Sequence, residues 1–231
     1  MANSDVLEFV HPSTMLVVGP TGSGKSNFVV RLLDDRMYDK PIDRVYWYYR
    51  EWQPLFQSIG CRHKNVQFIQ YLPESFDHLD VHEINLVIID DLMSDSGDST
   101  DVHNLFTVGS HHRNTSVVLI TQNLFDRGKS TRGISLNSHY IVLMKNPRDK
   151  MQVRAFAAQF SPSQTRYVVE AYEDATSQAY SYLLVDCRPE TPDEYRIRTR
   201  VFRSDVGGVI VYKPAQRAGK SASGSKGRRS T

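Results

Sequence analysis

The chain has 231 residues, of which 40% are hydrophobic and 23% charged, and it carries a net charge of +2. This length and composition exclude a disulfide-stabilised miniprotein, a fibrous repeat and a wholly disordered chain, and they favour one domain with a single core. No window approaches the roughly 18 apolar residues that span a bilayer, and residues 1–10 lack the features of a signal peptide. The two cysteines, Cys61 and Cys187, form no C-x-x-C pair, as is typical of a reducing compartment. We therefore expect a globular intracellular protein that does not act at a membrane.

The charge is distributed unevenly along the chain. From Lys213 to the end there are six basic residues and no acidic ones, which leaves 22 basic and 26 acidic residues, a charge of −4, for the rest. Residues 215–231 are also rich in Gly and Ser and lack an apolar period, which predicts a disordered arm. We expect a domain over residues 1–213 and a basic tail over 214–231. Such a tail binds nucleic acid, acts as a nuclear localisation signal or only increases solubility, and the sequence leaves these alternatives open.

The body of the chain alternates short β-rich runs with helical patterns, which predicts an α/β fold with a central, mostly parallel sheet flanked by helices. The first strand is expected at Thr14–Val18. A glycine-rich turn follows it, and then a helix whose apolar residues between Phe28 and Leu33 share one stripe. Further strands are expected at Arg44–Tyr49, Val66–Leu72, Asn85–Ile89, Ser116–Thr121 and Tyr140–Met144.

The last third of the chain predicts two helices followed by two strands. The helices are expected at Lys150–Gln159 and Pro162–Asp174. In the second helix Ser161 is placed to act as the N-cap, with a proline at the first helical position. The late strands are expected at Tyr180–Cys187 and Arg196–Phe202.

The turn after the first strand has the pattern G-x-x-x-x-G-K-[ST] of a phosphate-binding loop. The strand before it and the amphipathic helix after it are the context that this pattern requires. Its glycines allow successive backbone N–H groups to surround a β-phosphate, and the helix directs its positive end at the same anion. Lys25 is expected to bridge the β- and γ-phosphates of ATP, and the Ser26 hydroxyl to bind Mg²⁺. The expected nucleotide-binding residues are Gly19, Pro20, Thr21, Gly22, Ser23, Gly24, Lys25 and Ser26.

Two adjacent acids, Asp90 and Asp91, follow the apolar run at residues 86–89. A run of four apolar residues is typical of a strand buried on both faces. Asp90 is expected to hold Mg²⁺ together with Ser26, and Asp91 to polarise the water that attacks the γ-phosphate. The alternative is that two acids merely end a strand. Asp91 stands where many motor ATPases have Glu, and its side chain is one methylene shorter.

Gln122 follows the strand expected at Ser116–Thr121. The carboxyl ends of parallel strands form the ligand-binding edge of an open sheet. We therefore expect Gln122 to sense the γ-phosphate or to position water there. The alternative is an amide that only forms a turn.

These residues together resemble the poxvirus-type genome-packaging ATPases of DNA viruses and virus-like transposons, a branch of the FtsK–HerA class of P-loop DNA pumps. The matching segments are GPTGSGKS (19–26), LVIIDDLM (86–93), SHHRNTSVVLITQNLF (110–125) and ISLNSHYIVLMKNPRDK (134–150). The resemblance implies a P-loop NTPase fold of the ASCE/RecA-like type, in which the strand ending at Gln122 lies between the strand of the phosphate-binding loop and the strand of Asp90. It also implies an ATP-hydrolysing motor that assembles as a ring and packages double-stranded DNA into a capsid, at the site of virion assembly in the infected cell. Beyond about Tyr180 no segment matches the family.

Ring motors commonly supply an arginine to the γ-phosphate of a neighbouring subunit, because a planar, permanently charged group neutralises the charge that develops there. Arg113 and Arg132 are the two candidates, and Arg113 is favoured. The alternative is that both are solvated surface residues. The expected catalytic residues are thus Lys25, Asp90, Asp91, Gln122, Arg113 and Arg132.

The segment at residues 127–133 has three basic side chains among small residues, namely Arg127, Lys129 and Arg132. A loop of this kind contacts DNA phosphates without reading bases, which suits a pump that accepts any sequence. A plain surface loop is the alternative.

Two other functions remain open at this stage. A small-molecule or nucleotide kinase also begins with a strand, a phosphate-binding loop and a helix. A nucleotide-dependent assembly switch needs the loop but little turnover. The absence of a recognisable lid motif in the second half argues against the kinase, and the expected roles of Asp91 and Gln122 argue against the switch.

Aromatic residues gather at Tyr46–Tyr49, Trp52 and Phe56. Such a group stacks on the bases of single-stranded nucleic acid or packs in a core. Since aromatic residues are common in strands, we expect packing.

Overall fold

The computed structural model describes residues 8–92, 100–106, 113–125 and 129–214. Within them a nine-stranded sheet runs in the order β3-β2-β4-β5-β1-β6-β7-β8-β9. The first six strands pair in parallel, and the last three extend the sheet in antiparallel fashion. The strands are β1 (Thr14–Val18), β2 (Arg44–Tyr49), β3 (Val66–Gln70), β4 (Asn85–Asp90), β5 (Thr115–Thr121), β6 (Tyr140–Met144), β7 (Tyr182–Asp186), β8 (Ile197–Thr199) and β9 (Ile210–Tyr212).

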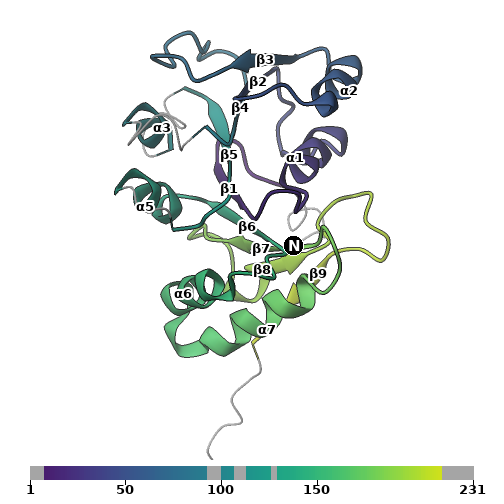
Figure 1. Cartoon of the computed structure of the whole chain (residues 1–231), viewed down its shortest axis with the longest axis vertical. Coiled ribbons are helices and arrows are strands. Elements are labelled where there is room, and N and C mark those ends of the chain that lie inside the picture. Colours follow the sequence, from purple (N-terminus) through teal and green to yellow (C-terminus); the bar gives the residue numbers. More distant parts are fainter. Residues whose placement is uncertain (1–7, 93–99, 107–112, 126–128, 215–231) are drawn as a thin grey trace, which may run out of the picture.

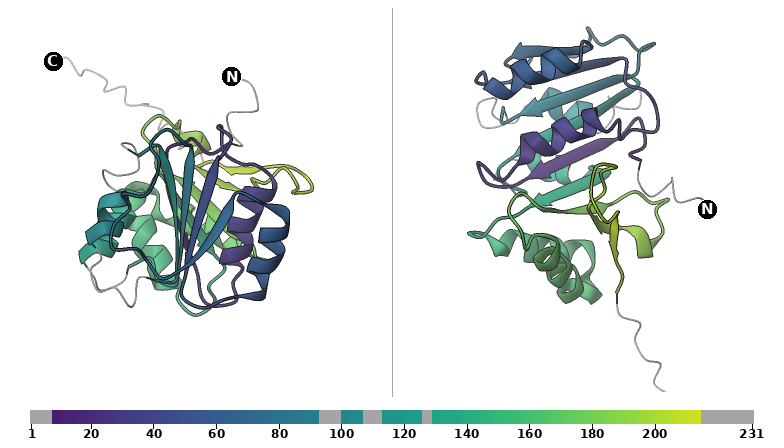
Figure 2. Two further views of the ribbon diagram at one scale, coloured as in Figure 1. Left: turned by 90° about the horizontal axis from the view of Figure 1, so that it is seen from above. Right: turned by 90° about the vertical axis from the view of Figure 1, so that its right-hand side faces the viewer.

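Helices cover both faces of this sheet, as Figures 1 and 2 show. One face carries α1 (Lys25–Asp34) and α2 (Pro54–Arg62). The other face carries α3 (Thr100–Asn104), α5 (Lys129–Leu136), α6 (Lys150–Phe160) and α7 (Thr165–Ala175). This confirms the expected α/β class with a mostly parallel sheet flanked by helices. Among the described residues no helix has the length and apolar character needed to cross a bilayer.

The sheet separates two apolar clusters because successive side chains of a strand point to opposite faces. In β1, Leu16 packs toward α6 and α7, whereas Met15 and Val17 pack toward α1 and α2. Every residue of β1, β4, β5 and β6 is buried. This two-sided burial explains why these strands appear in the sequence as continuous apolar runs.

β5 lies between β1 and β4, as the family resemblance implied. The register pairs Val18 of β1 with Thr121 of β5, and Asp90 of β4 with Ile120 of β5. The three strands therefore end side by side. The segments that follow them meet at one edge of the sheet.

The late part of the chain differs from the sequence prediction. The strand expected at Arg196–Phe202 is only the three residues of β8, because Arg200 has a left-handed backbone with φ 52° and ends it. Phe202 instead turns onto α1, where its ring centroid lies 4.9 Å from that of Phe28. β9 was not predicted, since a three-residue, half-buried edge strand leaves no pattern in the sequence.

The two helices after β6 begin differently from each other. α6 has a well-formed N-cap, since the Asp149 carboxylate accepts hydrogen bonds from the backbone N–H groups of Met151 and Gln152. The prediction that the Ser161 side chain caps the second helix is wrong. Ser161 precedes Pro162 as expected, but its side chain accepts no hydrogen bond from the following backbone N–H groups. A single 3₁₀ turn over Pro162–Gln164 precedes α7 instead.

The aromatic group of β2 and α2 packs in the core, as expected. Trp47, Tyr48 and Phe56 are fully buried. Trp52 is 56% exposed but packs its ring edge on Phe56, with ring centroids 5.5 Å apart.

Candidate nucleotide-binding site

The phosphate-binding loop starts at the carboxyl end of β1, beside the ends of β4 and β5. Its first residue is tied to β5 by a hydrogen bond of 3.2 Å from the Gly19 N–H to the Thr121 carbonyl. The loop turns back on itself through a bond from the Ser23 N–H to the Pro20 carbonyl, also 3.2 Å. At its other end the Gly24 carbonyl accepts a hydrogen bond of 2.9 Å from the Phe28 N–H of α1, so the loop is anchored to the sheet at one end and to α1 at the other.

Two glycines give this loop its shape. Gly22 and Gly24 have φ angles of 77° and 98°, in the left-handed region that side chains rarely adopt. Gly24 is also the N-cap of α1, and because it has no side chain it leaves the first N–H groups of the helix uncapped. These N–H groups and the helix dipole form an anion site at the start of α1.

Gly19 is required for a different reason, namely close packing. A Cβ at this position would lie 2.6 Å from the Met144 Cβ and 2.7 Å from the Ser23 Oγ. We expect Gly19→Ala to lower the free energy of unfolding by about 1–3 kcal/mol and to distort the loop. In the control Gly60→Ala the new methyl would lie 3.7 Å from Phe68, an ordinary contact, within a helix. Urea unfolding of both variants checks this, and equal stabilities would contradict the crowding at Gly19.

The Lys25 ammonium lies inside the loop and bonds to its backbone. Its Nζ donates to the carbonyls of Gly19 at 2.7 Å and Pro20 at 3.0 Å. Burial lowers the pKa of Lys25, while the nearby carboxylates of Asp91 and Asp90 oppose that shift. Bridging two phosphates requires the ammonium to exchange these carbonyl contacts for phosphate oxygens, and a phosphate also provides the negative charge that a half-buried ammonium lacks.

Asp90 ends β4 with its side chain 6% exposed. Burial raises the pKa of its carboxyl to about 6, and the polar groups of Trp47, Lys25 and Ser26 around it counteract that rise. No hydrogen bond of good geometry reaches the Trp47 indole N–H or the Asp90 Oδ2, although both atoms are buried and the indole lies close enough to lower the pKa of the carboxyl. The site therefore holds a buried carboxylate oxygen without a well-formed hydrogen bond, beside an indole N–H and a serine hydroxyl.

These donors fit a divalent cation. An unpaired, buried carboxylate oxygen is costly unless it binds a proton or a metal ion. Mg²⁺ is commonly bound by one or two protein oxygens together with substrate phosphates, not by a full protein cage. Consistently, no three His, Cys, Asp or Glu side chains gather as metal ligands within the part of the chain that the structure describes. Ser26 and Asp90 are the residues that would hold Mg²⁺ here.

Asp91 and Gln122 form a second polar pair at the same edge. The Gln122 Nε2 donates to the Asp91 Oδ2 at 3.1 Å, and both residues are exposed. Asp91 has a left-handed backbone, with φ 54°, which turns it away from the line of β4. Strained backbone of this kind occurs frequently at functional sites. The pair is open to solvent, whereas Asp90 is closed off from it.

A cavity of about 310 Å³ brings the loop and the three polar residues together. Thr21, Gly22, Gly24, Lys25, Ser26, Asp90, Asp91 and Gln122, all predicted from the sequence, line it. Asn27, Gln53, Leu55 and Tyr180 also line it and were not predicted. Gln53 and Leu55 lie at the start of α2, and Tyr180 lies just before β7. No sequence pattern relates these segments to the loop, because only the packing of the sheet brings them there.

Of the residues predicted to act in trans or to contact DNA, Arg113 is the one whose side chain lies within the described residues. Arg113 precedes β5 and lies at the opposite edge of the sheet, where it donates to the Phe76 carbonyl and, at 2.7 Å, to Asp77. Arg127 and the side chains of Lys129 and Arg132 lie outside the described residues. The trans role of Arg113 or Arg132 and the DNA contacts of this segment stay predictions.

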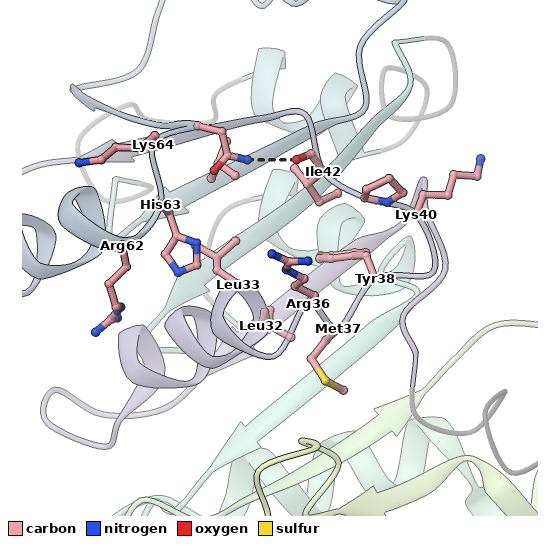
Figure 3. A pocket seen from close by; sticks show the side chains of 13 residues that line it. Leu32, Leu33, Arg36, Met37, Tyr38, Lys40, Ile42, Arg62, His63 and Lys64 are labelled. Carbon is pink, nitrogen blue, oxygen red and sulfur yellow. Dashed lines mark hydrogen bonds between the residues drawn. The ribbon is translucent and has the colours of Figure 1, made fainter.

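A second hollow, of about 320 Å³, lies at the opposite edge of the sheet (Figure 3). Its floor consists of apolar side chains of α1 and β2. In Figure 3 the charged ends of Lys40, Arg62 and Lys64 point away from the hollow. His63 is bound to Asp34 at 2.7 Å. Arg36 differs from these cations, since in Figure 3 its guanidinium lies among the lining side chains, near Leu33 and Tyr38. One guanidinium over an apolar floor does not form a triphosphate site, and we assign no nucleotide to this hollow.

The structure resembles solved structures of the genome packaging NTPase from Sulfolobus turreted icosahedral virus 2. Its complex with AMPPCP superposes with a TM-score of 0.53 at 14% sequence identity, covering 87% of this chain and 97% of that chain. For the complex with ATP-gammaS the TM-score is 0.51 at 15% identity, covering 92% and 99%. At this level of identity the likeness shows a shared fold. Structural neighbours of the chain are thus viral genome packaging NTPases, in agreement with the resemblance of its sequence.

No protein-family model matches the sequence. The search of curated proteins also finds no match.

Proposed function

We propose that the chain is an ATPase that packages double-stranded DNA into a viral capsid as a ring of identical subunits. The observation that carries this proposal is the cavity in which Lys25, Ser26 and Asp90 face Asp91 and Gln122. The first three residues have the chemistry to bind Mg²⁺ and a triphosphate, and the last two have the chemistry to position a water molecule. The shared fold with a packaging NTPase that was solved with ATP-gammaS supports the choice of motor.

In the proposed mechanism the loop N–H groups and the start of α1 bind the β-phosphate. Lys25 moves from the carbonyls of Gly19 and Pro20 to the β- and γ-phosphate oxygens. Ser26 and Asp90 are the residues that would hold Mg²⁺, which when bound would neutralise charge on the triphosphate. The buried Asp90 carboxylate is costly as an isolated charge. Binding a cation offsets that cost, so the site favours a cation.

Asp91 is placed to accept a proton from the attacking water, and Gln122 to orient that water through its amide. In the present arrangement the Gln122 amide bonds to Asp91, which holds the two groups together at the open side of the cavity. Water reaches this side freely because both residues are exposed. A kinase would instead need an acceptor substrate at this position, so the arrangement favours hydrolysis.

DNA is the proposed partner because the loop at residues 127–133 holds three basic residues and the tail at residues 214–231 holds five, both without an acid, while the rest of the chain has 20 basic against 26 acidic residues. Phosphate contacts from such segments are independent of DNA sequence. We place the protein at the site of virion assembly in the infected cell, with capsid proteins as further partners. In the ring, Arg113 or Arg132 would reach the γ-phosphate bound by the neighbouring subunit.

Phosphate release with and without double-stranded DNA, at increasing salt concentration, tests this function. We expect DNA to raise the rate of hydrolysis several-fold at low salt, and the stimulation to fade as salt displaces the phosphate contacts. A Lys25→Ala preparation controls for contaminating ATPases. Hydrolysis that DNA does not affect at any salt would exclude the translocase. Transfer of phosphate to a nucleotide acceptor would support a kinase, and tight binding without turnover would support an assembly switch.

A further inference from the structure

Tyr180 lies against the phosphate-binding loop although nearly 160 residues separate them in the sequence. A Cβ on Gly24 would lie 3.3 Å from the Tyr180 Cδ1, so the ring passes directly beside the start of α1. The ring borders the nucleotide cavity of about 310 Å³. It also borders two adjoining hollows of about 420 and 550 Å³. Tyr180 therefore stands where the phosphate cavity opens into further space.

The sheet order determines which end of a nucleotide reaches this tyrosine. Asp90 ends β4, two strands from β1 on one side, whereas Tyr180 precedes β7, two strands from β1 on the other side. A γ-phosphate belongs on the side of Asp90 and Gln122. The sugar and base must therefore leave the loop on the opposite side, past Gly24 and toward Tyr180.

Packing of the protein itself does not account for the position of this side chain. Tyr180 is 69% exposed, and its backbone has φ 61°, a conformation that a bulky residue adopts only at a cost. The loop around it is nevertheless held firmly. The Lys145 side chain donates from its Nζ to the Ser177 carbonyl at 2.7 Å, before Tyr180 in the chain. The Lys145 backbone N–H donates to the Ser181 carbonyl at 3.2 Å, after Tyr180. The ring is thus presented to solvent from a fixed loop, beside an anion site.

We propose that Tyr180 is the platform on which the base of the bound nucleotide stacks. This inference rests on the proposed function, because it assumes that a nucleoside triphosphate occupies the loop. Every nucleobase has a π-face, so an aromatic platform binds the base through its area and dispersion and needs no hydrogen bond from the tyrosine hydroxyl. The phenyl ring, not the hydroxyl, is the functional part.

Titration calorimetry with two ligands, Mg-ATP and inorganic tripolyphosphate with Mg²⁺, tests the platform. Tyr180→Ala should weaken ATP binding about tenfold, the contribution of one stacked base. It should leave tripolyphosphate binding unchanged, because that ligand has no base. Tyr180→Phe should bind ATP like the wild type.

Tyr71 offers a matched control. It is also an exposed tyrosine with a left-handed backbone, at 56% exposure and φ 66°, and it follows β3 at the same edge without lining the nucleotide cavity. Tyr71→Ala should leave the affinity for both ligands unchanged. Thermal unfolding of each variant shows whether it is folded, and Tyr180→Gly, which suits φ 61°, supplies a second truncation that relieves the backbone.

The outcomes are distinct. Unchanged ATP affinity in Tyr180→Ala and Tyr180→Gly would overturn the platform and leave the ATPase proposal intact. Equal weakening of ATP and tripolyphosphate would also overturn it, since Tyr180 would then only shape the loop. If the wild type bound neither ligand, the proposed function itself would be wrong, and the platform with it.

Discussion

Replacing Lys25 with alanine should lower the rate of ATP hydrolysis by about 100- to 1000-fold, the usual cost of removing one preorganised charge from a transition state. The ammonium is the cation closest to where charge develops between the β- and γ-phosphates. It already lies inside the loop, 2.7 Å from the Gly19 carbonyl. Steady-state phosphate release at saturating ATP measures the effect.

Lys64→Ala is the matched control for this variant. Lys64 is an exposed lysine at the opposite edge of the sheet, where it donates to the Gly60 carbonyl at 3.3 Å. Its removal should leave turnover unchanged. If both lysine variants hydrolysed ATP at the wild-type rate, the loop would not be the site of the reaction.

The second large effect concerns Asp90, where activity and stability should change in opposite directions. Asp90→Asn should lower Mg²⁺-dependent hydrolysis by about 100-fold or more, since an amide replaces the charged metal ligand. In the absence of nucleotide and Mg²⁺ the same variant should be more stable than the wild type. The reason is that burial raises the pKa of this carboxyl to about 6, so that its charged form destabilises the empty protein.

The pH dependence of this difference follows from linkage. The folded protein binds the Asp90 proton more tightly than the unfolded chain, whose carboxyl has a pKa of 3.8. The wild type therefore loses stability as the pH rises from about 4 to about 6, by up to about 3 kcal/mol, and the full loss remains at higher pH. Urea unfolding of wild type and Asp90→Asn across this range should show their difference growing with pH and then becoming constant.

Asp91→Asn serves as the control for the stability effect. Asp91 is exposed, and asparagine tolerates the left-handed backbone at this position. Because this variant keeps Asp90, its unfolding free energy should fall with rising pH as that of the wild type does, by a smaller amount because the Asp91 charge that helps to raise the Asp90 pKa is gone, while hydrolysis falls. A pH-independent difference between Asp90→Asn and the wild type would contradict the raised pKa of the buried Asp90 carboxyl.

The sequence determined the elements that depend on local pattern. The apolar runs of β1, β4 and β5 are continuous because both faces of these strands are buried, and each run ends at the residue that enters the site. The glycines of the loop have no side chain to pack, so their spacing with Lys25 is itself the structural signal. The nucleotide site was predictable because its main parts are strand ends, and parallel strand ends meet at one edge.

Only the tertiary structure decided how distant segments approach this edge. Tyr180 reaches Gly24 because β7 turns back antiparallel beside β6, and no periodicity in the sequence encodes that pairing. The same applies to Gln53 at the start of α2, which lines the cavity, and to Trp47, whose indole lies beside the Asp90 carboxyl. These contacts join residues far apart in the chain, and their energies come from burial and packing that exist only once the sheet is assembled. The phosphate end of the proposed site was therefore predictable from the sequence, whereas the proposed base end, at Tyr180, comes only from the fold.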